Sequence, residues 1–322
     1  MNRTFLVSLF CGCLGITLPA AEPSVRSTAE PISQVVNQAA DELQWSYRGK
    51  PLLVYAFAQT QIKPYVRELY TLRGENVLRD APADHPHHHG LMYAVHVNGI
   101  NFWEEQDEPG VEKSIRLEPG TPGRNSNGQP EAAFTQWIHW VAFTNRMVVD
   151  STAVALLIEK RTLTLTVDER AGEVALVWEA QFELGTNTPQ VQLRGANYNG
   201  LGLRLPEAFN KVAQFANSEG VAYTGDNTQN VIPAKWTSAS GMMANQNIML
   251  ALFGPNANAN DRARFFTMTE PFAYLAVTQG LNQKPLEYRG GDRFRLRYLL
   301  TVYSENQSRE FIARRAETWS RP

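Results

Sequence analysis

Short runs of alternating apolar and polar residues follow one another along most of the chain, and this pattern constrains the fold more than any other feature. The runs are rich in β-branched and aromatic residues and are bounded by Gly, Pro, Asn or Asp, which is typical of β-strands. The stretch "DERAGE" (168–173) predicts a hairpin turn between two long strands. The expected strands cover residues 52–57, 66–72, 91–97, 134–143, 154–168, 173–184, 191–205, 248–254, 272–279 and 293–304.

About a dozen strands with few helices indicate an all-β sandwich or barrel, and the lack of a fixed-period repeat argues against a propeller. The tail at 308–319 predicts a helix that Ser308 caps. Helical spacing of apolar residues from Ile32 to Leu43 predicts a short helix before the domain. We therefore expect a linker and short helix over 21–44 and one large antiparallel two-sheet domain over 45–322. Residues 105–131 are polar and rich in Gly and Pro, which predicts a long loop with one short strand at 113–117.

The first residues, "MNRTFLVSLFCGCLGITLPAAEPS", have the order of a secretory signal peptide: a positive charge, an apolar run and a small residue at position 20. We expect residues 1–20 to be removed and the protein to be exported, to the periplasm or beyond; a lipid anchor at Cys13 is the less favoured alternative. Both cysteines, Cys11 and Cys13, lie in this segment. The mature chain would then have no disulfide, thiol nucleophile or cysteine-bound zinc.

Composition excludes two classes of partner. The formal net charge is -2 and the pI is about 6.3, so no basic surface for nucleic acid is expected. After the N-terminal segment, no apolar run approaches the length of a transmembrane helix. The expected partner is a small molecule; the aromatic residues near the motifs below, and the family resemblance that follows them, point to a sugar or oligosaccharide.

The stretch "DHPHHHG" (84–90) holds four of the six histidines of the chain. Pro82 and Pro86 stiffen it, which indicates a held geometry. If this loop is extended, His85, His87 and His89 share one face and His88 takes the other. The loop then predicts an acid–base site that needs no cofactor, or a site for one divalent metal ion. The alternative is a loop whose imidazoles only bind backbone groups. The metal ligands would be Asp84, His85, His87 and His89, with Glu104, His139 and Glu270 as further candidates.

Two later stretches carry polar groups that an apolar core does not need. "ANYNGLGLR" (196–204) offers Asn197, Tyr198 and Arg204, although a bulged edge strand explains it equally well. "MTEPFAYLAVTQ" (268–279) places Glu270 at the mouth of an aromatic strand, where it is either a base, a ligand or a surface turn residue. Aromatic rings such as Trp103 would suit the faces of sugar rings.

The run "KPYVRELYTLRGENVLRDAPADHPHHHGLMYAVHVNGINFW" (63–103) resembles the signature block of an exported bacterial family labelled "methane oxygenase PmoA" or domain of unknown function. "YNGLGLR" (198–204), "NSEG" (217–220) and "TEPFAYLAVTQ" (269–279) match it too, so the resemblance runs from about residue 50 to 305. The label describes an integral membrane copper enzyme, which this chain does not resemble. The resemblance implies a galactose-mutarotase-like supersandwich, the fold of many carbohydrate-active enzymes.

In mutarotase-like sites, histidines and a glutamate exchange protons with the sugar, so the resemblance implies that His85, His87, His88 and Glu270 are catalytic. His89 is the least secure member, because relatives often have Arg or Gln there. The expected function is an exported carbohydrate-active enzyme of the epimerase, lyase or hydrolase type. The alternatives are a non-catalytic sugar-binding module and a metal-binding protein. The expected substrate-binding residues are Lys63, Tyr65, Tyr93, Trp103, Asn197, Tyr198 and Arg204.

Overall fold

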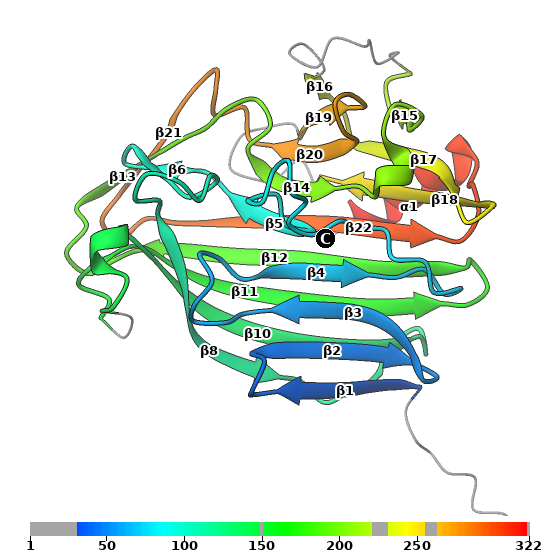
Figure 1. Cartoon of the computed structure of the whole chain (residues 1–322), viewed down its shortest axis with the longest axis horizontal. Helices are drawn as coiled ribbons and strands as arrows, with labels where there is room; N and C mark the ends of the chain where they lie inside the picture. The colour runs from blue at the N-terminus through cyan, green and yellow to red at the C-terminus, as the bar shows by residue number, and fades with distance from the viewer. Residues whose placement is uncertain (1–30, 149–150, 221–230, 255–262, 321–322) are drawn as a thin grey trace, which may run out of the picture.

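The computed structural model describes residues 31–148, 151–220, 231–254 and 263–320. Within these ranges, two antiparallel nine-stranded sheets form a β-sandwich, and a four-stranded sheet lies at one end (Figure 1). The all-β two-sheet fold expected from the strand pattern is confirmed. No helix in the described ranges is both long and apolar enough to cross a membrane.

The first sheet bears the candidate site described below. Neighbouring strands pair in antiparallel register throughout. In spatial order the strands are β1 (Ile32–Asn37), β2 (Glu42–Tyr47), β3 (Lys50–Ala56), β4 (Tyr65–Leu69), β5 (Leu91–Ala94), β14 (Gly200–Arg204), β20 (Tyr274–Thr278), β19 (Arg264–Met268) and β16 (Val231–Pro233).

The second sheet contains the longest strands. Its order is β15 (Gln214–Asn217), β17 (Trp236–Met243), β18 (Gln246–Phe253), β22 (Arg293–Tyr303), β12 (Glu173–Leu184), β11 (Ala155–Asp168), β10 (Pro130–Val141) and β8 (Val111–Pro119), with β9 (Gly123–Arg124) paired to β10. The small sheet is β21 (Leu286–Arg289), β13 (Gln190–Arg194), β6 (His96–Val97) and β7 (Ile100–Asn101). Two 3₁₀ turns, η1 (Phe143–Asn145) and η2 (Glu207–Phe209), lie in connections.

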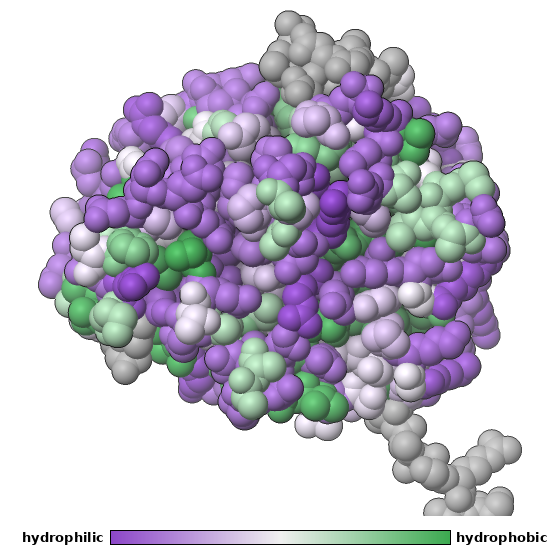
Figure 2. All heavy atoms as spheres, viewed as in Figure 1, coloured by the Kyte–Doolittle hydropathy of each residue, from purple (hydrophilic) through white to green (hydrophobic). Residues whose placement is uncertain are grey.

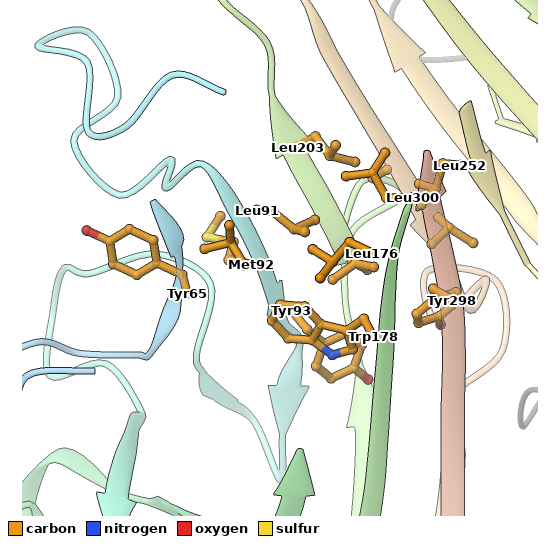
Figure 3. Packing of buried hydrophobic residues seen from close by; sticks show 14 of the residues in the cluster. Tyr65, Leu91, Met92, Tyr93, Leu176, Trp178, Leu203, Leu252, Tyr298 and Leu300 are labelled. Carbon is orange, nitrogen blue, oxygen red and sulfur yellow. The ribbon is translucent and has the colours of Figure 1, made fainter. Parts of the chain in front are cut away.

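Alternation along the strands builds the core between the two sheets. In β11, buried and partly exposed residues alternate from Ala155 to Asp168, as the period of two requires. Figure 3 shows side chains of β5 and β14 facing side chains of β12 and β22 across this core. Each large apolar side chain buried there contributes about 1.5–3 kcal/mol. The face seen in Figure 2 is mainly hydrophilic, with apolar residues in small separate patches.

The C-terminal helix α1 (Arg309–Trp319) confirms the helix expected at 308–319. Ser308 caps it, because its side chain accepts a hydrogen bond from the backbone N–H of Phe311. Ile312 and Ala316 are buried against the outer side of the second sheet, in a cluster that includes Trp236. The helix therefore packs outside the sandwich, as expected.

Two expectations about the N-terminal half are wrong. The helix expected from Ile32 to Leu43 is a hairpin, because β1 and β2 pair over its length and Val35 and Val36 favour strand geometry. The sandwich therefore begins near residue 32 and not at 45. The loop expected over 105–131 is wrong in its extent: the strand expected within it at 113–117 is present, but as the longer β8, which pairs with β10 from Val111 to Pro119. The predicted signal peptide at 1–20 lies outside the described residues.

Candidate functional site

The candidate site lies on the outer side of the first sheet. Tyr274 of β20 is the register partner of Arg204 in β14 and of Met268 in β19, so these three side chains share one side of the sheet. Leu203, next to Arg204, belongs to the core on the other side (Figure 3). Loops before β5, after β7 and before β14 close over this outer side. Alternation therefore decides which residues can reach the site.

Gly202 of β14 makes room for two of the site's rings. A Cβ atom at this position would lie 1.7 Å from Oη of Tyr274 and 3.1 Å from Cη2 of Trp103. Both aromatic side chains therefore lie over bare backbone. The glycine that the sequence shows inside a strand-like run serves this close approach.

The site is a cavity of about 450 Å³, which falls within the usual size range of small-molecule sites. Its lining combines three imidazoles, one carboxylate and one amide with five aromatic rings. It consists of His85, His87, His88, Trp103, Glu104, Asn197, Tyr198, Phe266, Met268, Pro271, Phe272 and Tyr274.

The histidine loop is turned and not extended, so the expected division of its faces is wrong. The backbone N–H of His85 donates to O of Pro82 at 2.9 Å, and that of His88 donates to O of His85 at 3.0 Å. These are two successive tight turns. They bring His88 beside His85, with ring centroids 4.7 Å apart, and beside His87, at 4.6 Å. Three imidazoles therefore gather at the cavity, and His89 is left out.

His89 belongs to a charged cluster behind the loop. Its Nδ1 lies 2.9 Å from Asp80 and its Nε2 lies 3.0 Å from Glu105, while Lys63 contacts Glu105 at 2.7 Å. The ring stacks on Tyr65 at 4.0 Å. Burial lowers the pKa of His89, but the hydrogen bonds to Asp80 and Glu105 outweigh it, and the net shift is upward. His89, bound between two acidic side chains, holds the loop in place.

In Glu105, too, burial and the neighbouring groups shift the pKa in opposite directions. Burial raises its pKa, but the hydrogen bond from His89 and the charge of Lys63 together lower it to about 2. The carboxylate is therefore ionised at any physiological pH. Lys63 and Tyr65, predicted to bind substrate, instead support the loop and do not line the cavity.

His87 and His88 are neutral at pH 7. Burial, and then the neighbouring His87 and His85, lowers the pKa of His88 to about 3. Burial, and then the charge of Lys63, lowers the pKa of His87. In the part of the chain that the structure describes, Nδ1 of each ring is buried without a hydrogen-bond partner. Both rings can accept a proton or hydrogen-bond to a ligand.

His85 is oriented by a chain of hydrogen bonds from Arg204 through Asp84. Its Nδ1 lies 3.1 Å from Oδ2 of Asp84, and Nη2 of Arg204 donates to the same oxygen at 3.1 Å. Burial raises the pKa of Asp84, but the hydrogen bond with His85 and the charge of Arg204 outweigh it and lower the pKa. An ionised Asp84 accepts from Nδ1–H, so the neutral ring of His85 carries its lone pair on Nε2. Arg204 itself is buried and stacks on Phe272 at 3.5 Å.

The cavity gathers six of the residues predicted for the site: His85, His87, His88, Trp103, Asn197 and Tyr198. Arg204 and Asp84 do not line the cavity. They contact residues that do: Asp84 hydrogen-bonds to His85, and Arg204 stacks on Phe272. Tyr93 is not a pocket residue, because alternation in β5 places it in the core. There Trp140 packs against its ring, and its hydroxyl donates a hydrogen bond to Oε1 of Gln279. Glu270 is exposed and precedes Pro271, which lines the cavity, so its role stays a prediction.

Sequence reasoning missed Phe266, Phe272 and Tyr274 as pocket residues. They come from strand-like apolar runs that also predict core, and nothing in those runs distinguishes the two. Glu104 was considered only as a metal ligand, whereas it is the carboxylate among the lining residues that the structure describes.

The predicted metal ligands do not converge. His89 binds Asp80 and Glu105, away from the cavity that His85 and His87 line. In the described ranges, no group of three or more His, Cys, Asp or Glu side chains is placed to hold a metal ion.

The fold and the cavity define a β-sandwich protein with a histidine-bearing aromatic pocket on its first sheet. The chain belongs to the family described as "Family of unknown function (DUF6807)", whose match covers residues 42–317. That description does not include the methane oxygenase label, so the resemblance to the family carrying this label stays a prediction. No curated protein matches the chain.

Solved structures similar to this chain are longer enzymes. A GH36 alpha-galactosidase, AgaB from Geobacillus stearothermophilus, has 11% identity and a TM-score of 0.46 over 85% of this chain and 41% of its own. An alpha-galactosidase from Lactobacillus brevis has 10% identity and a TM-score of 0.44, over 84% and 40%. A GH97 enzyme from Pseudoalteromonas sp. strain K8 in complex with panose has 5% identity and a TM-score of 0.41, over 85% and 34%. The chain thus spans about two fifths or less of these proteins.

Proposed function

We propose that this protein is a carbohydrate-active enzyme that moves protons at a sugar bound in the cavity, with His85 as the principal acid–base group. The observation that supports the proposal is the chain of hydrogen bonds from Arg204 through Asp84 to His85, which lines an aromatic cavity. A carboxylate that fixes the tautomer of a histidine is how many enzymes prepare a base. We further propose that it acts outside the cytoplasm, as the pattern of residues 1–20 predicts.

The cavity suits a sugar because it offers two kinds of contact. Trp103 and Tyr198 present rings against which the C–H faces of a sugar stack, and Asn197 adds an amide for its hydroxyl groups. The volume of about 450 Å³ accommodates a small ring compound and not a long polymer inside the cavity.

Proton transfer would use His85 as the base and the other polar groups of the cavity as hydrogen-bond partners of the sugar. Nε2 of His85 takes a proton from a hydroxyl or an acidic C–H group of the sugar, and Asp84 stabilises the imidazolium that forms. The neutral rings of His87 and His88 line the same cavity, and their N–H groups can donate hydrogen bonds to the atom that gains negative charge. Glu104 can accept hydrogen bonds from the sugar hydroxyl groups. In epimerisation, a proton returns to the same carbon from the opposite face. In β-elimination, the leaving-group oxygen takes the proton as its bond to the sugar breaks and a double bond forms. In hydrolysis, His85 takes the proton from a water molecule that attacks the anomeric carbon, and the leaving oxygen is protonated as it departs.

A non-catalytic sugar-binding module is the rival. Such a module uses the rings and the amide but has no use for an arginine and a carboxylate that orient one imidazole. A metal-binding protein is a further rival; it requires His87 or His88 to bind an ion through the Nδ1 atoms that have no partner in the described residues.

The test is a panel of mono- and oligosaccharides incubated in D₂O with the purified protein and followed by proton NMR. We expect one class of sugar to exchange a proton or to be converted, and His85→Ala to slow that change by about 10²–10⁴-fold. Lys160→Ala, on the second sheet and away from the cavity, is the matched control and should keep the wild-type rate. Equal rates in the wild type and His85→Ala would refute the catalytic role.

A further inference from the structure

Four rings of the cavity form a closed circuit of contacts. The ring centroids of Trp103 and Tyr198 are 5.5 Å apart, those of Tyr198 and Phe266 are 6.1 Å apart, those of Phe266 and Tyr274 are 6.2 Å apart, and those of Tyr274 and Trp103 are 6.1 Å apart. Interplanar angles between 58° and 81° show that neighbouring rings stand across one another and are not stacked. All four line the cavity, so they form an aromatic box.

The box meets the cavity chiefly at Tyr198. This ring is half-buried, whereas Trp103, Tyr274 and Phe266 are only 1%, 2% and 4% exposed. A cation in the cavity against Tyr198 lies within the range of roughly 6 Å over which a ring face attracts it. Gly202 keeps the floor beneath Trp103 and Tyr274 clear of a side chain.

The charges around the box favour a cation. Glu104 lines the cavity, and its Oε2 accepts a hydrogen bond from Asn101 at 3.2 Å; it has no ion pair within the described residues. The nearby cations are each paired with a carboxylate: Lys63 with Glu105, His89 with Asp80 and Glu105, and Arg204 with Asp84. His87 and His88 are held neutral by burial. Glu104 is thus the charge that a ligand against the box would meet.

We propose that this box and Glu104 bind an organic cation, an alkylammonium group carried by the substrate. The inference rests on the proposed function and specifies its substrate: a sugar derivative whose ammonium group lies in the cavity against the box, beside Tyr198 and Glu104, while His85 acts on a neighbouring atom. Such a group comes either from a quaternary ammonium substituent or from an amino sugar. The competing explanation is that the four rings serve only as an apolar floor, which would bind a neutral ligand of the same shape equally well.

The test compares two pairs of ligands by isothermal titration calorimetry with the full protein. Choline and its uncharged isostere 3,3-dimethyl-1-butanol differ only in charge, and glucosamine and glucose differ chiefly in the ammonium group. We expect the cation of at least one pair to bind about tenfold more tightly than its neutral partner, as cation–π attraction and a carboxylate together provide. The pair that shows the difference identifies the source of the ammonium group.

Variants locate the binding at the box. Tyr198→Leu removes a half-buried ring and Glu104→Gln removes the charge, so each should abolish most of the preference for the cation. Tyr198→Phe keeps the ring and should retain the preference, which separates ring loss from misfolding. Lys160→Ala should bind as the wild type does.

Equal binding of both members in each pair, or binding of neither, overturns the inference. The proposed function then still stands if His85→Ala slows sugar conversion. Conversely, preferential binding of the cation together with an unchanged rate in His85→Ala supports the box and refutes the acid–base role. The two claims therefore fail in distinguishable ways.

Discussion

At the scale of single residues, His88 and His89 are neighbours in the chain whose pKa values shift in opposite directions. Burial, and then the neighbouring His87 and His85, lowers the pKa of His88 to about 3. His89 turns towards Asp80 and Glu105, whose hydrogen bonds raise its pKa despite burial. The loop thus separates a histidine that lines the cavity from one that holds the loop in place.

This division predicts a stability optimum near neutral pH. The pKa of His89 is raised on folding, so its contribution is fully present below the unfolded value of 6.5 and is lost as pH rises through the folded value. The pKa values of His87 and His88 are lowered, so their unfolded forms bind more protons and stability falls as pH drops below 6.5. Calorimetry should show His89→Gln without the alkaline decline; an unchanged decline would contradict this assignment.

Asp84 allows a second test at the residue scale. Asp84→Asn removes the charge that orients His85 and stabilises its imidazolium, so we expect the rate to fall by about 10²-fold or more. The melting temperature should change little, since the Asp84 side chain is half exposed. A lower melting temperature with an unchanged rate would indicate a structural role only.

At the scale of elements, the rings of Tyr274 and Trp103 pack directly on the backbone of strand β14 at Gly202. Gly202→Ala brings a Cβ within 1.7 Å of Oη of Tyr274, so the ring must move. We expect a loss of about 1–3 kcal/mol in the free energy of unfolding and weaker ligand binding. Gly123→Ala in β9 has nothing within 4 Å of the new Cβ and is the matched control. Denaturant unfolding measures both; equal stability of the two variants would contradict the account.

The sequence predicted most strands, the turn at 168–173 and the C-terminal helix, because alternation and a serine cap are local signals. It missed β1 because pairing with β2 overrides helical spacing.

The sequence located the site through the histidine loop but not the turns that place His88 in the cavity and His89 outside it. Phe266 and Tyr274 were missed for a physical reason: loops cover the outer side of β19 and β20, so both sides of these strands are apolar and alternation disappears.

At the scale of the whole molecule, a buried ionic cluster ties the two sheets together. Arg161 of β11 binds Glu159 and Glu112 in the second sheet, and it reaches the first sheet through Tyr55 and O of Pro64. Burial raises the pKa of Glu112 to about 8, although the charge of Arg161 lowers it. Arg161 therefore holds both acidic side chains of the second sheet and links them to the first sheet.

Removal of this arginine should weaken the whole sandwich. Arg161→Met leaves Glu159 buried without its counter-charge, which costs about 3–5 kcal/mol in comparable cases. Arg293→Met breaks the exposed pair with Glu183 and should change the free energy of unfolding by about 0.5 kcal/mol or less. Urea unfolding distinguishes the two; a loss from Arg161→Met as small as that from Arg293→Met would show that the cluster does not hold the sheets.

A crystal structure of the protein with the sugar that it converts or binds most tightly would test the acid–base role of His85 directly. We expect the sugar to occupy the cavity, with its ring against Trp103 or Tyr198 and a reacting group within about 2.6–3.2 Å of Nε2 of His85. A sugar bound elsewhere on the molecule, or one in the cavity whose reacting atoms lie beyond the reach of His85, would contradict that role.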